Sequence, residues 1–585
     1  MDKQHKNEKK GWSGWVLAAT LSLTAIGFSA ALLQPAALAQ EPTSNTQKTN
    51  AQTGAQSKTQ SSVEGRPPQI QTPGSDQAKA GRRISPEQAR QLFSLVDQLI
   101  KFSSEETGLP IKSQVKRQIT SRAAVESYIE KKFNEDQSAR RLQRDEIVLK
   151  KFGLLDRDFA LKPFLLALLK EQIAAYYDFK SKTIYMLDWV DIEEQKPVLA
   201  HELTHALQDQ HSNLERWSDQ TPDSLSLNSS DDTSHLVRDE MDTARQAVVE
   251  GQATVVMMDY ILKPMGKSLV KNPEIMDFVK QRMAESQDSP VLARAPLLLS
   301  ESLLFPYREG LSFEQEVWMD QGRTAAFTGT LDQPPTSSWE IINPREYEQR
   351  HTPAVPLLPN IHPLVDKLYK PYDIGQIGQL DLHILTELFG GGQAASDLTP
   401  AWDGGLYWAG QRRDAKTPAE QAGTDSIALF YLSAWKNPAS AEAFASLYAD
   451  ELGRKYSGVQ LLDQSAGSAA SAGQPSELGV PASQEQVYST SEGPVVITTR
   501  GKLVFVAESF PLELARQLTA LVLDAQGAGE LHLAQAAPSA GFAGQTAAPS
   551  LDSEDREPLT ANLIRFLSDC GVMKTAVEAA VQAGK

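Results

Sequence analysis

Cysteine is almost absent from this sequence, since Cys570 is the only one among 585 residues. A single thiol cannot form a disulfide within the chain, and it excludes any metal site that needs several cysteines. A metal ion would therefore have to be held by His, Asp or Glu side chains. Histidine is also scarce, with 9 residues in the whole chain, so a regular spacing between two of them is informative.

Basic residues are too few for a typical nucleic-acid-binding protein. The chain has 57 Lys and Arg against 74 Asp and Glu, which gives a net charge of −17. Surfaces that bind nucleic acid need clustered Lys and Arg. We therefore expect no nucleic acid as a partner. The hydrophobic content of 41% and charged content of 22% are typical of a globular protein.

The first 39 residues have the pattern of a secretory signal peptide. Lysines between Lys3 and Lys10 precede an apolar run over 12–33, and Ala37-Leu38-Ala39 supplies small residues before a cleavage site. We predict an exported bacterial protein located in the periplasm, in the cell envelope or outside the cell. The alternative is an uncleaved anchor, because the apolar run approaches the length that spans a bilayer. Only through such an anchor would we expect contact with a membrane.

Length and composition divide the rest of the chain, because 585 residues exceed one compact domain. Residues 40–83 are rich in Gln, Thr, Ser, Pro and Gly and are predicted to be a disordered linker. We predict a mainly helical domain over 84–395 and a smaller α+β domain over 396–530. A linker over 531–556 and a C-terminal helix over 557–585 complete the chain. The predicted fold class is α+β.

Periodicity and capping signals locate the expected elements. Ser85-Pro86-Glu87 indicates a helix start, because Ser caps the first turn and Pro suits its first position. Helical or apolar stretches follow at 119–134, 137–152, 161–169, 193–210, 238–262, 273–285, 296–327, 438–455 and 511–524. Strands are expected at 173–177, 183–187, 404–410, 426–433 and 495–506, the last of these broken by a turn. An Ala/Gly/Ser-rich insert at 464–485 is expected to be a loop.

The sequence His201-Glu-Leu-Thr-His205 is the strongest chemical signal in the chain. On a helix, residues four apart share a face, so both imidazoles can reach one metal ion at about 2.0–2.1 Å. Glu202 would lie beside the ion, where its carboxylate can accept a proton from water. The alternative is a pair of ordinary histidines on a helix. We interpret the motif as a metal site with Glu202 as the catalytic residue.

A third ligand is needed, and Glu250 is the candidate that the residues favour. It lies in the apolar stretch 247–256, where burial of a carboxylate is costly unless it is paired or bound to metal. Gly251 beside it permits another helix to approach closely. The alternative for Glu250 is an ion pair with Arg245.

His211 is the second candidate for the third ligand. It follows His205 by six residues, the spacing of the metzincin pattern, but that pattern has Gly where this chain has Gln208. If the helix continues, His211 lies about 9 Å further along its axis and misses the ion.

The two histidines together with Glu250 resemble the gluzincin pattern of metallopeptidases. More narrowly, the chain is similar to a poorly characterised group of exported bacterial zincin-like proteins. The similarity rests on Lys-Phe-Gly-Leu-Leu at 151–155, Ala-Tyr-Tyr-Asp at 175–178, and the segments 201–211, 244–254 and 306–310. This resemblance covers about 150–350 and implies a zincin-like domain over 84–395. It also implies Zn²⁺ as cofactor and peptide-bond hydrolysis as the reaction.

Two positions depart from that resemblance. Gluzincins commonly carry Asp four residues after the ligand Glu, where it orients the first histidine, and here that residue is Thr254. The partner of the histidine would then be the Thr254 hydroxyl or lie elsewhere. The narrower group tends to carry a His before a downstream Pro, where this chain has Asn343. A catalytic role for that His would leave this protein weakened or inactive.

The expected function is that of an exported zinc-dependent peptidase, which hydrolyses a peptide or protein substrate through a zinc-bound water activated by Glu202. The strands at 173–187 could offer an edge to an extended substrate. Tyr307, His235, Tyr347 and His351 are equal candidates for stabilising the oxyanion. The alternative from another class is an inactive zincin-fold binding or scaffold protein of the envelope. A zinc hydrolase acting on a bond other than a peptide bond is the third option.

Overall fold

The computed structural model describes residues 83–135, 137–218, 240–285, 289–466 and 483–526, with single positions at 232, 236, 563, 564, 567, 575, 579 and 582. All of these belong to one compact unit. The predicted signal peptide and the predicted linker over 531–556 lie outside the described residues. Within the described part, no helix combines the length and apolar character needed to cross a membrane.

The described chain starts with a helix that is capped as its sequence indicates. Helix α1 covers Pro86–Thr107, and the Ser85 hydroxyl accepts a hydrogen bond from the Gln88 backbone N–H while the Gln88 side chain accepts one from Ser85. This reciprocal capping satisfies two backbone donors that a helix start leaves open. The predicted start at Ser85-Pro86 is confirmed.

A small sheet of three strands follows from segments far apart in the chain. Its strands are β1 (Lys116–Thr120), β2 (Tyr176–Asp178) and β3 (Thr183–Leu187), in the order β1-β3-β2. Strand β3 pairs with β1 in parallel and with β2 in antiparallel orientation. The helix predicted over 119–134 is therefore wrong at its start, because Ile119 pairs with Met186 and α2 begins at Arg122. The strand predicted over 173–177 begins only at Tyr176, since Ile173 caps the preceding helix.

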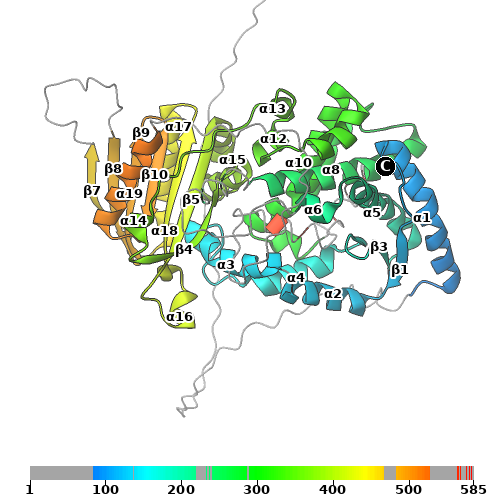
Figure 1. Ribbon diagram of the computed structural model, residues 1–585, viewed down its shortest axis with the longest axis horizontal. Coiled ribbons are helices and arrows are strands. Elements are labelled where there is room, and N and C mark those ends of the chain that lie inside the picture. The colour runs from blue at the N-terminus through cyan, green and yellow to red at the C-terminus, as the bar shows by residue number, and fades with distance from the viewer. Residues whose placement is uncertain are drawn as a thin grey trace, which may run out of the picture. The chain divides into compact units, whose positions relative to one another are not determined.

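Helices make up most of the part around this sheet (Figure 1). They are α2 (Arg122–Glu135), α3 (Gln137–Phe152), α4 (Leu161–Gln172), α5 (Ile192–Ser212), α6 (Leu214–Ser218), α8 (Met241–Leu262), α9 (Glu274–Glu285), α10 (Leu297–Gln321) and the short α11 (Thr330–Asp332), α12 (Ser338–Ile342), α13 (Pro344–Glu348) and α14 (His362–Val365). The predicted helix over 296–327 ends at Gln321, and a π-helical turn, η3, covers Ala325–Gly329.

Helix α8 lies at the centre of this helical part, where it packs against α5 on one side and α10 on another. It meets the backbone of α10 at two glycines. A methyl group added to Gly251 would overlap the backbone of Gly310, and one added to Gly310 would overlap the backbone of Ala247. The two backbones are thus in direct contact, as the glycine beside Glu250 indicated.

A seven-stranded antiparallel sheet forms from the following part of the chain. Its order is β4-β5-β6-β10-β9-β8-β7. The strands are β4 (Tyr369–Gln376), β5 (Trp402–Arg412), β6 (Ile427–Trp435), β7 (Gln460–Ala466), β8 (Ser483–Thr490), β9 (Gly493–Arg500) and β10 (Leu503–Glu508). Because β4 already pairs with β5, the sheet begins before residue 396, where the boundary of the second domain was predicted.

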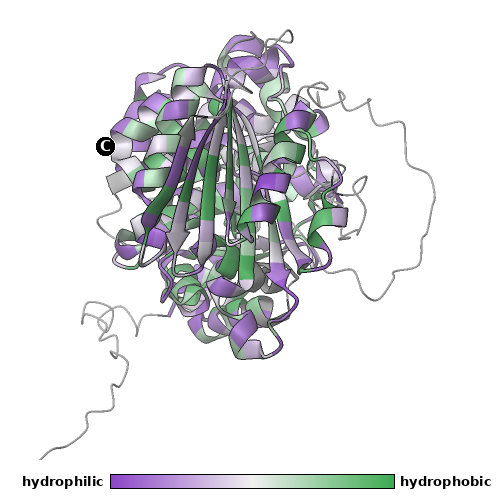
Figure 2. Ribbon diagram, turned by 90° about the vertical axis from the view of Figure 1, so that its left-hand side faces the viewer, coloured by the Kyte–Doolittle hydropathy of each residue, from purple (hydrophilic) through white to green (hydrophobic). Residues whose placement is uncertain are grey.

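Helices cover both faces of this sheet. Strand β10 alternates between them, with Val504 and Val506 in one hydrophobic cluster and Phe505 in the other. The first cluster includes α17 (Pro438–Asp450), and the second includes α19 (Leu512–Ala525). Helix α15 (Gln379–Leu398) packs beside β5. Figure 2 shows that hydrophobic residues are concentrated on the central strands, as expected of a sheet buried on both faces.

A buried ionic network joins the helical part to the sheet. The Lys151 ammonium, from the segment 151–155, contacts the Glu492 carboxylate at 2.8 Å and the Ser509 hydroxyl at 2.7 Å. Near it, Lys455 pairs with the fully buried Glu508, and Arg157 also reaches Glu492. Lys151 and Lys455 are themselves buried. Described residues on both sides of residue 396 therefore share one interior.

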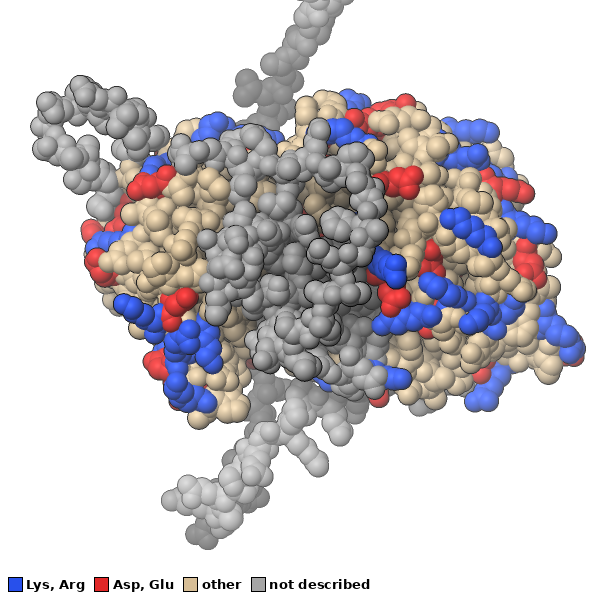
Figure 3. Space-filling model, viewed as in Figure 1, with Lys and Arg blue, Asp and Glu red and all other residues tan. Residues whose placement is uncertain are grey.

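The charges of the surface are mixed despite the acidic composition. On the face shown in Figure 3, basic and acidic side chains are interspersed over the described residues. The net charge of −17 is therefore not expressed as one acidic patch on that face.

Candidate metal centre

Helix α5 carries both predicted histidines and is longer than expected. Its first turn is capped by Asp191, whose carboxylate accepts a hydrogen bond from the Glu193 backbone at 2.9 Å. It ends at Asn213, which adopts a left-handed conformation with φ of 55°. His211 therefore still lies on the helix, where it contacts Asp332 at 3.0 Å. The structure does not bring His211 to the other two histidines.

Glu250 comes from α8 and meets both histidines of α5. Its Oε2 atom lies 3.1 Å from His201 Nε2 and 3.4 Å from His205 Nε2. The side chains of His201, His205 and Glu250 are 0%, 12% and 4% exposed. The group is therefore buried, and His205 is its most exposed member. Arg245, the alternative partner, instead pairs with Asp242. The structure thus brings together the three residues predicted as ligands.

These distances fit a metal ion held by two imidazoles and a carboxylate. Ligand bonds of about 2.0–2.1 Å in a tetrahedron put the donor atoms about 3.3 Å apart. The two contacts of Glu250, at 3.1 and 3.4 Å, bracket that separation. The ligand atoms of His201, Glu202 and His205 also lie within 4.8 Å of one another. The buried group could therefore hold a metal ion.

His201, His205 and Glu250 are called the metal group below. Glu202 lies between this group and the small sheet. Its side chain is buried, and it accepts a hydrogen bond from the backbone N–H of Tyr177 in β2. Its Oε1 atom has no hydrogen-bond partner among the described residues. One carboxylate oxygen is therefore held by the protein, and the other is available to a bound molecule.

Burial and mutual charge set the protonation of this group. Burial raises the pKa of Glu202 to about 7, and the charge of Glu250 adds to this effect. Burial also raises the pKa of Glu250, but the charge of His205 and hydrogen bonds from both histidines outweigh it, so that its pKa falls to about 2.

The two histidines shift in opposite directions. Burial and the neighbouring charge of His205 lower the pKa of His201 to about 4. Burial lowers the pKa of His205 as well, but the charge and hydrogen bond of Glu250 together raise it to about 9. Without a metal, the pair of histidines thus carries one positive charge at neutral pH, on His205 beside the ionised Glu250.

The second nitrogen of each histidine has a different environment. His205 Nδ1 lies 2.9 Å from the side-chain oxygen of Gln208. His201 Nδ1 has no partner among the described residues, and neither has the hydroxyl of Thr254. The suggested hydrogen bond between Thr254 and the first histidine is therefore absent from the described part of the structure.

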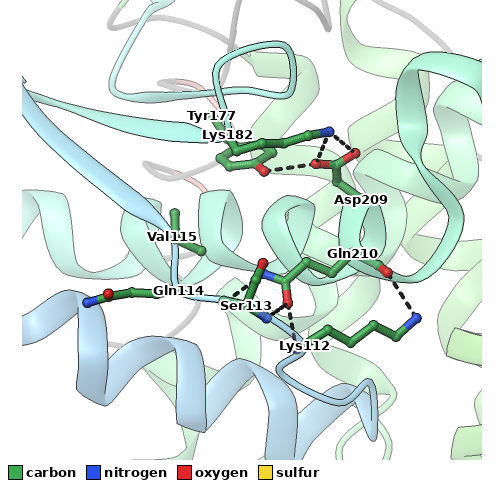
Figure 4. Close-up of a pocket in the computed structure, with 8 residues that line it drawn as sticks. All are labelled: Lys112, Ser113, Gln114, Val115, Tyr177, Lys182, Asp209 and Gln210. Atoms are coloured by element: carbon green, nitrogen blue, oxygen red, sulfur yellow. Dashed lines mark hydrogen bonds and ion pairs between the residues drawn. The ribbon is translucent and has the colours of Figure 1, made fainter.

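The hairpin of β2 and β3 is fastened to the end of α5 (Figure 4). The Tyr177 hydroxyl donates to Asp209 at 2.9 Å, and the Lys182 ammonium contacts both Asp209 oxygens at 2.9 and 2.7 Å. These residues line a cavity of about 230 Å³ together with the segment 112–115 and Gln210. Because Tyr177 also holds Glu202, this attachment fixes the position of the predicted base.

The remaining predicted residues are scattered. The Tyr307 ring lies 6.2 Å from that of His201, centre to centre. The Tyr347 hydroxyl donates to the Gln333 carbonyl, and His351 contacts Glu346 on the surface. His235 lies outside the described residues. Of the described oxyanion candidates, Tyr307 lies beside the metal group.

Asn343, where the resemblance would place a histidine, holds two elements together. Its amide donates to the carbonyl of Trp339 and to the side chain of Gln379, at 2.8 and 2.9 Å. It thereby joins α12 to the first turn of α15.

Comparison of the chain with protein-family models, with curated proteins and with solved structures finds no match.

Proposed function

We propose that this protein is an exported zinc-dependent peptidase. The observation that carries the proposal is the meeting of His201, His205 and Glu250 beside the partly free carboxylate of Glu202. Two imidazoles and one carboxylate are a ligand set typical of catalytic zinc, which keeps a further position open. Export rests on the sequence pattern of residues 1–39.

A zinc ion bound by these three residues would supply Lewis acidity, which lowers the pKa of water and polarises a carbonyl. Glu202 would take the proton from the attacking water at Oε1 and deliver it to the amine that leaves. The hydrogen bond from Tyr177 N–H restrains this carboxylate, which has an oxygen within 4.8 Å of a ring nitrogen of each histidine. In the metal-free protein burial raises the pKa of Glu202 to about 7, in the range that suits a general base at neutral pH.

The substrate would lie along β2. This strand is at the edge of the three-stranded sheet, and the backbone N–H of its residue Tyr177 donates a hydrogen bond to Glu202. Because the Tyr177 N–H already donates to Glu202, an extended peptide beside this edge would use the other backbone groups of the strand and would pass the catalytic carboxylate. An extended peptide is therefore the substrate that we propose for this site.

The test is zinc content and cleavage of casein or a peptide library by wild type and by Glu202→Gln. We expect both proteins to bind zinc, because Glu202 is not among the three proposed ligands. Cleavage should fall by about 10²–10⁴-fold in the variant, since it lacks the general base. Equal cleavage by both proteins, or none by either, would refute the proposal.

A second candidate function is a non-catalytic binding protein with a structural metal. The observation in its favour is that Glu202 lies with His201 and His205 in a group whose ligand atoms are within 4.8 Å of one another. If Glu202 were a fourth ligand, the site would be closed, as structural zinc sites are. Glu202→Gln would then weaken metal binding itself, whereas a base can be replaced without loss of metal.

A further inference from the structure

Behind His205 lies a chain of buried amides that leads away from the metal group. The His205 ring nitrogen Nδ1 is 2.9 Å from Gln208 Oε1. The Gln208 Nε2 group donates to the Val249 carbonyl and to Gln252 Oε1, both at 2.9 Å. Both glutamines are fully buried, so neither amide exchanges these partners for water.

The chain ends on backbone carbonyls of the π-helical turn η3. Gln252 Nε2 lies 3.0 Å from the Ala326 carbonyl, 2.9 Å from the Phe327 carbonyl and 2.8 Å from the Thr330 hydroxyl. A π-turn is wider than an α-helical turn and is uncommon in proteins. Here its carbonyls point at an amide that is two links away from a metal ligand.

The direction of every hydrogen bond in this chain is determined by those carbonyls. A backbone carbonyl only accepts, so the NH₂ group of Gln252 must face Ala326 and Phe327, and its oxygen must face Gln208. The NH₂ group of Gln208 then faces both Gln252 and Val249, and its oxygen faces His205. Nδ1 of His205 must therefore carry the proton.

We infer that Gln208 and Gln252 are positioning residues that hold His205 in the tautomer able to bind a metal. With the proton on Nδ1, the neutral ring presents the lone pair of Nε2, and Nε2 is the atom that lies 3.4 Å from Glu250. The bonds all run in one direction, so that each polarises the next. This inference rests on the proposed metal site but not on the proposed reaction.

The experiment compares zinc affinity, by competition with a chromophoric chelator, in the intact protein and in volume-matched variants. The hydrogen bonds that run from His205 through Gln208 and Gln252 to η3 are called the relay. Gln208→Met and Gln252→Met remove it and should each weaken zinc binding by about 10–100-fold. Gln315→Met is the control, because Gln315 is also buried but donates to the Leu269 carbonyl, away from the relay. It should bind zinc as the wild type does.

Gln208→Glu separates the tautomer from general packing. A carboxylate still accepts the proton of His205 Nδ1, although it can no longer donate to Val249 or Gln252. Its zinc affinity should lie within a few-fold of the wild type, even if its thermal midpoint falls. This variant keeps the inference testable if the methionine variants fail to fold.

The outcomes are distinguishable. Wild-type affinity in Gln252→Met, or affinity in Gln208→Glu as weak as in Gln208→Met, overturns the relay alone. A wild-type protein that binds no zinc overturns both the relay and the proposed function. If zinc affinity falls in Gln208→Met and Gln252→Met but not in Gln208→Glu, and Glu202→Gln cleaves peptides as fast as the wild type, the relay is supported and the proposed peptidase function is refuted.

Discussion

Replacement of Gly251 by alanine tests how closely the helix that carries Glu250 must approach its neighbour. An exposed Gly→Ala change inside a helix normally stabilises it by about 1 kcal/mol. At Gly251 the new methyl group would overlap the carbonyl of Gly310, which is backbone and cannot rotate away. Overpacking in a well-packed core costs about 1–3 kcal/mol, and a rigid backbone neighbour puts this site at the upper end.

The expected net effect of Gly251→Ala is therefore a loss of about 2 kcal/mol, the difference between about 3 and about 1. Relief of the overlap requires α8 to move away from α10, and Glu250 moves with α8. Zinc affinity should fall together with stability. The measurements are the thermal unfolding midpoint of the metal-free protein and zinc affinity by chelator competition.

Gly392→Ala is the matched control, because a methyl group there meets no atom of the described residues within 4 Å. We expect it to leave both the midpoint and the zinc affinity unchanged, or to raise the midpoint slightly. If Gly251→Ala is as stable and binds zinc as tightly as this control, the contact between the two backbones does not position Glu250.

Two further predictions concern His205 and His211. The pKa of His205 is raised from 6.5 to about 9 in the folded, metal-free protein, so the folded state keeps a proton that the unfolded chain loses. The stability from this group is fully present below pH 6.5 and is lost between pH 6.5 and 9, by about 3 kcal/mol. Thermal midpoints of chelator-treated protein across this range should show the fall, and an equal fall in His205→Gln would contradict its assignment to this group. His211→Ala should keep stoichiometric zinc by metal analysis, because His211 contacts Asp332 rather than the metal group; a loss of zinc would restore His211 as a ligand.

Local patterns in the sequence predicted which of these side chains would lie together. The spacing of His201 and His205 depends on the geometry of one helix, and that helix could be recognised from its apolar flanks. Glu250 was found from another local conflict, an acidic residue in an apolar helix, because such a residue needs a partner. The structure places these residues together, although the chemistry that they perform stays a prediction.

Features that depend on distant pairing could not be predicted in the same way. The residues of strand β4 include Lys370, Pro371 and Asp373, which are not typical of a strand. The strand lies at the sheet edge, where proline is tolerated. Strand β1 forms beside β3, more than sixty residues later in the chain. Gln208 and Gln252 give no signal in sequence, because glutamine is ordinary in a helix and only the fold brings the two amides and η3 together.

The network around Lys151 has a consequence for the order in which the chain can fold. Lys151 is separated from its partner Glu492 by 341 residues and from Ser509 by 358. Until Glu492 is present, the Lys151 ammonium group lacks the carboxylate that it contacts in the folded protein, and a buried cation without its partner costs about 3–5 kcal/mol. The helical part that carries the metal group thus reaches its final packing against the sheet only when the chain is nearly complete.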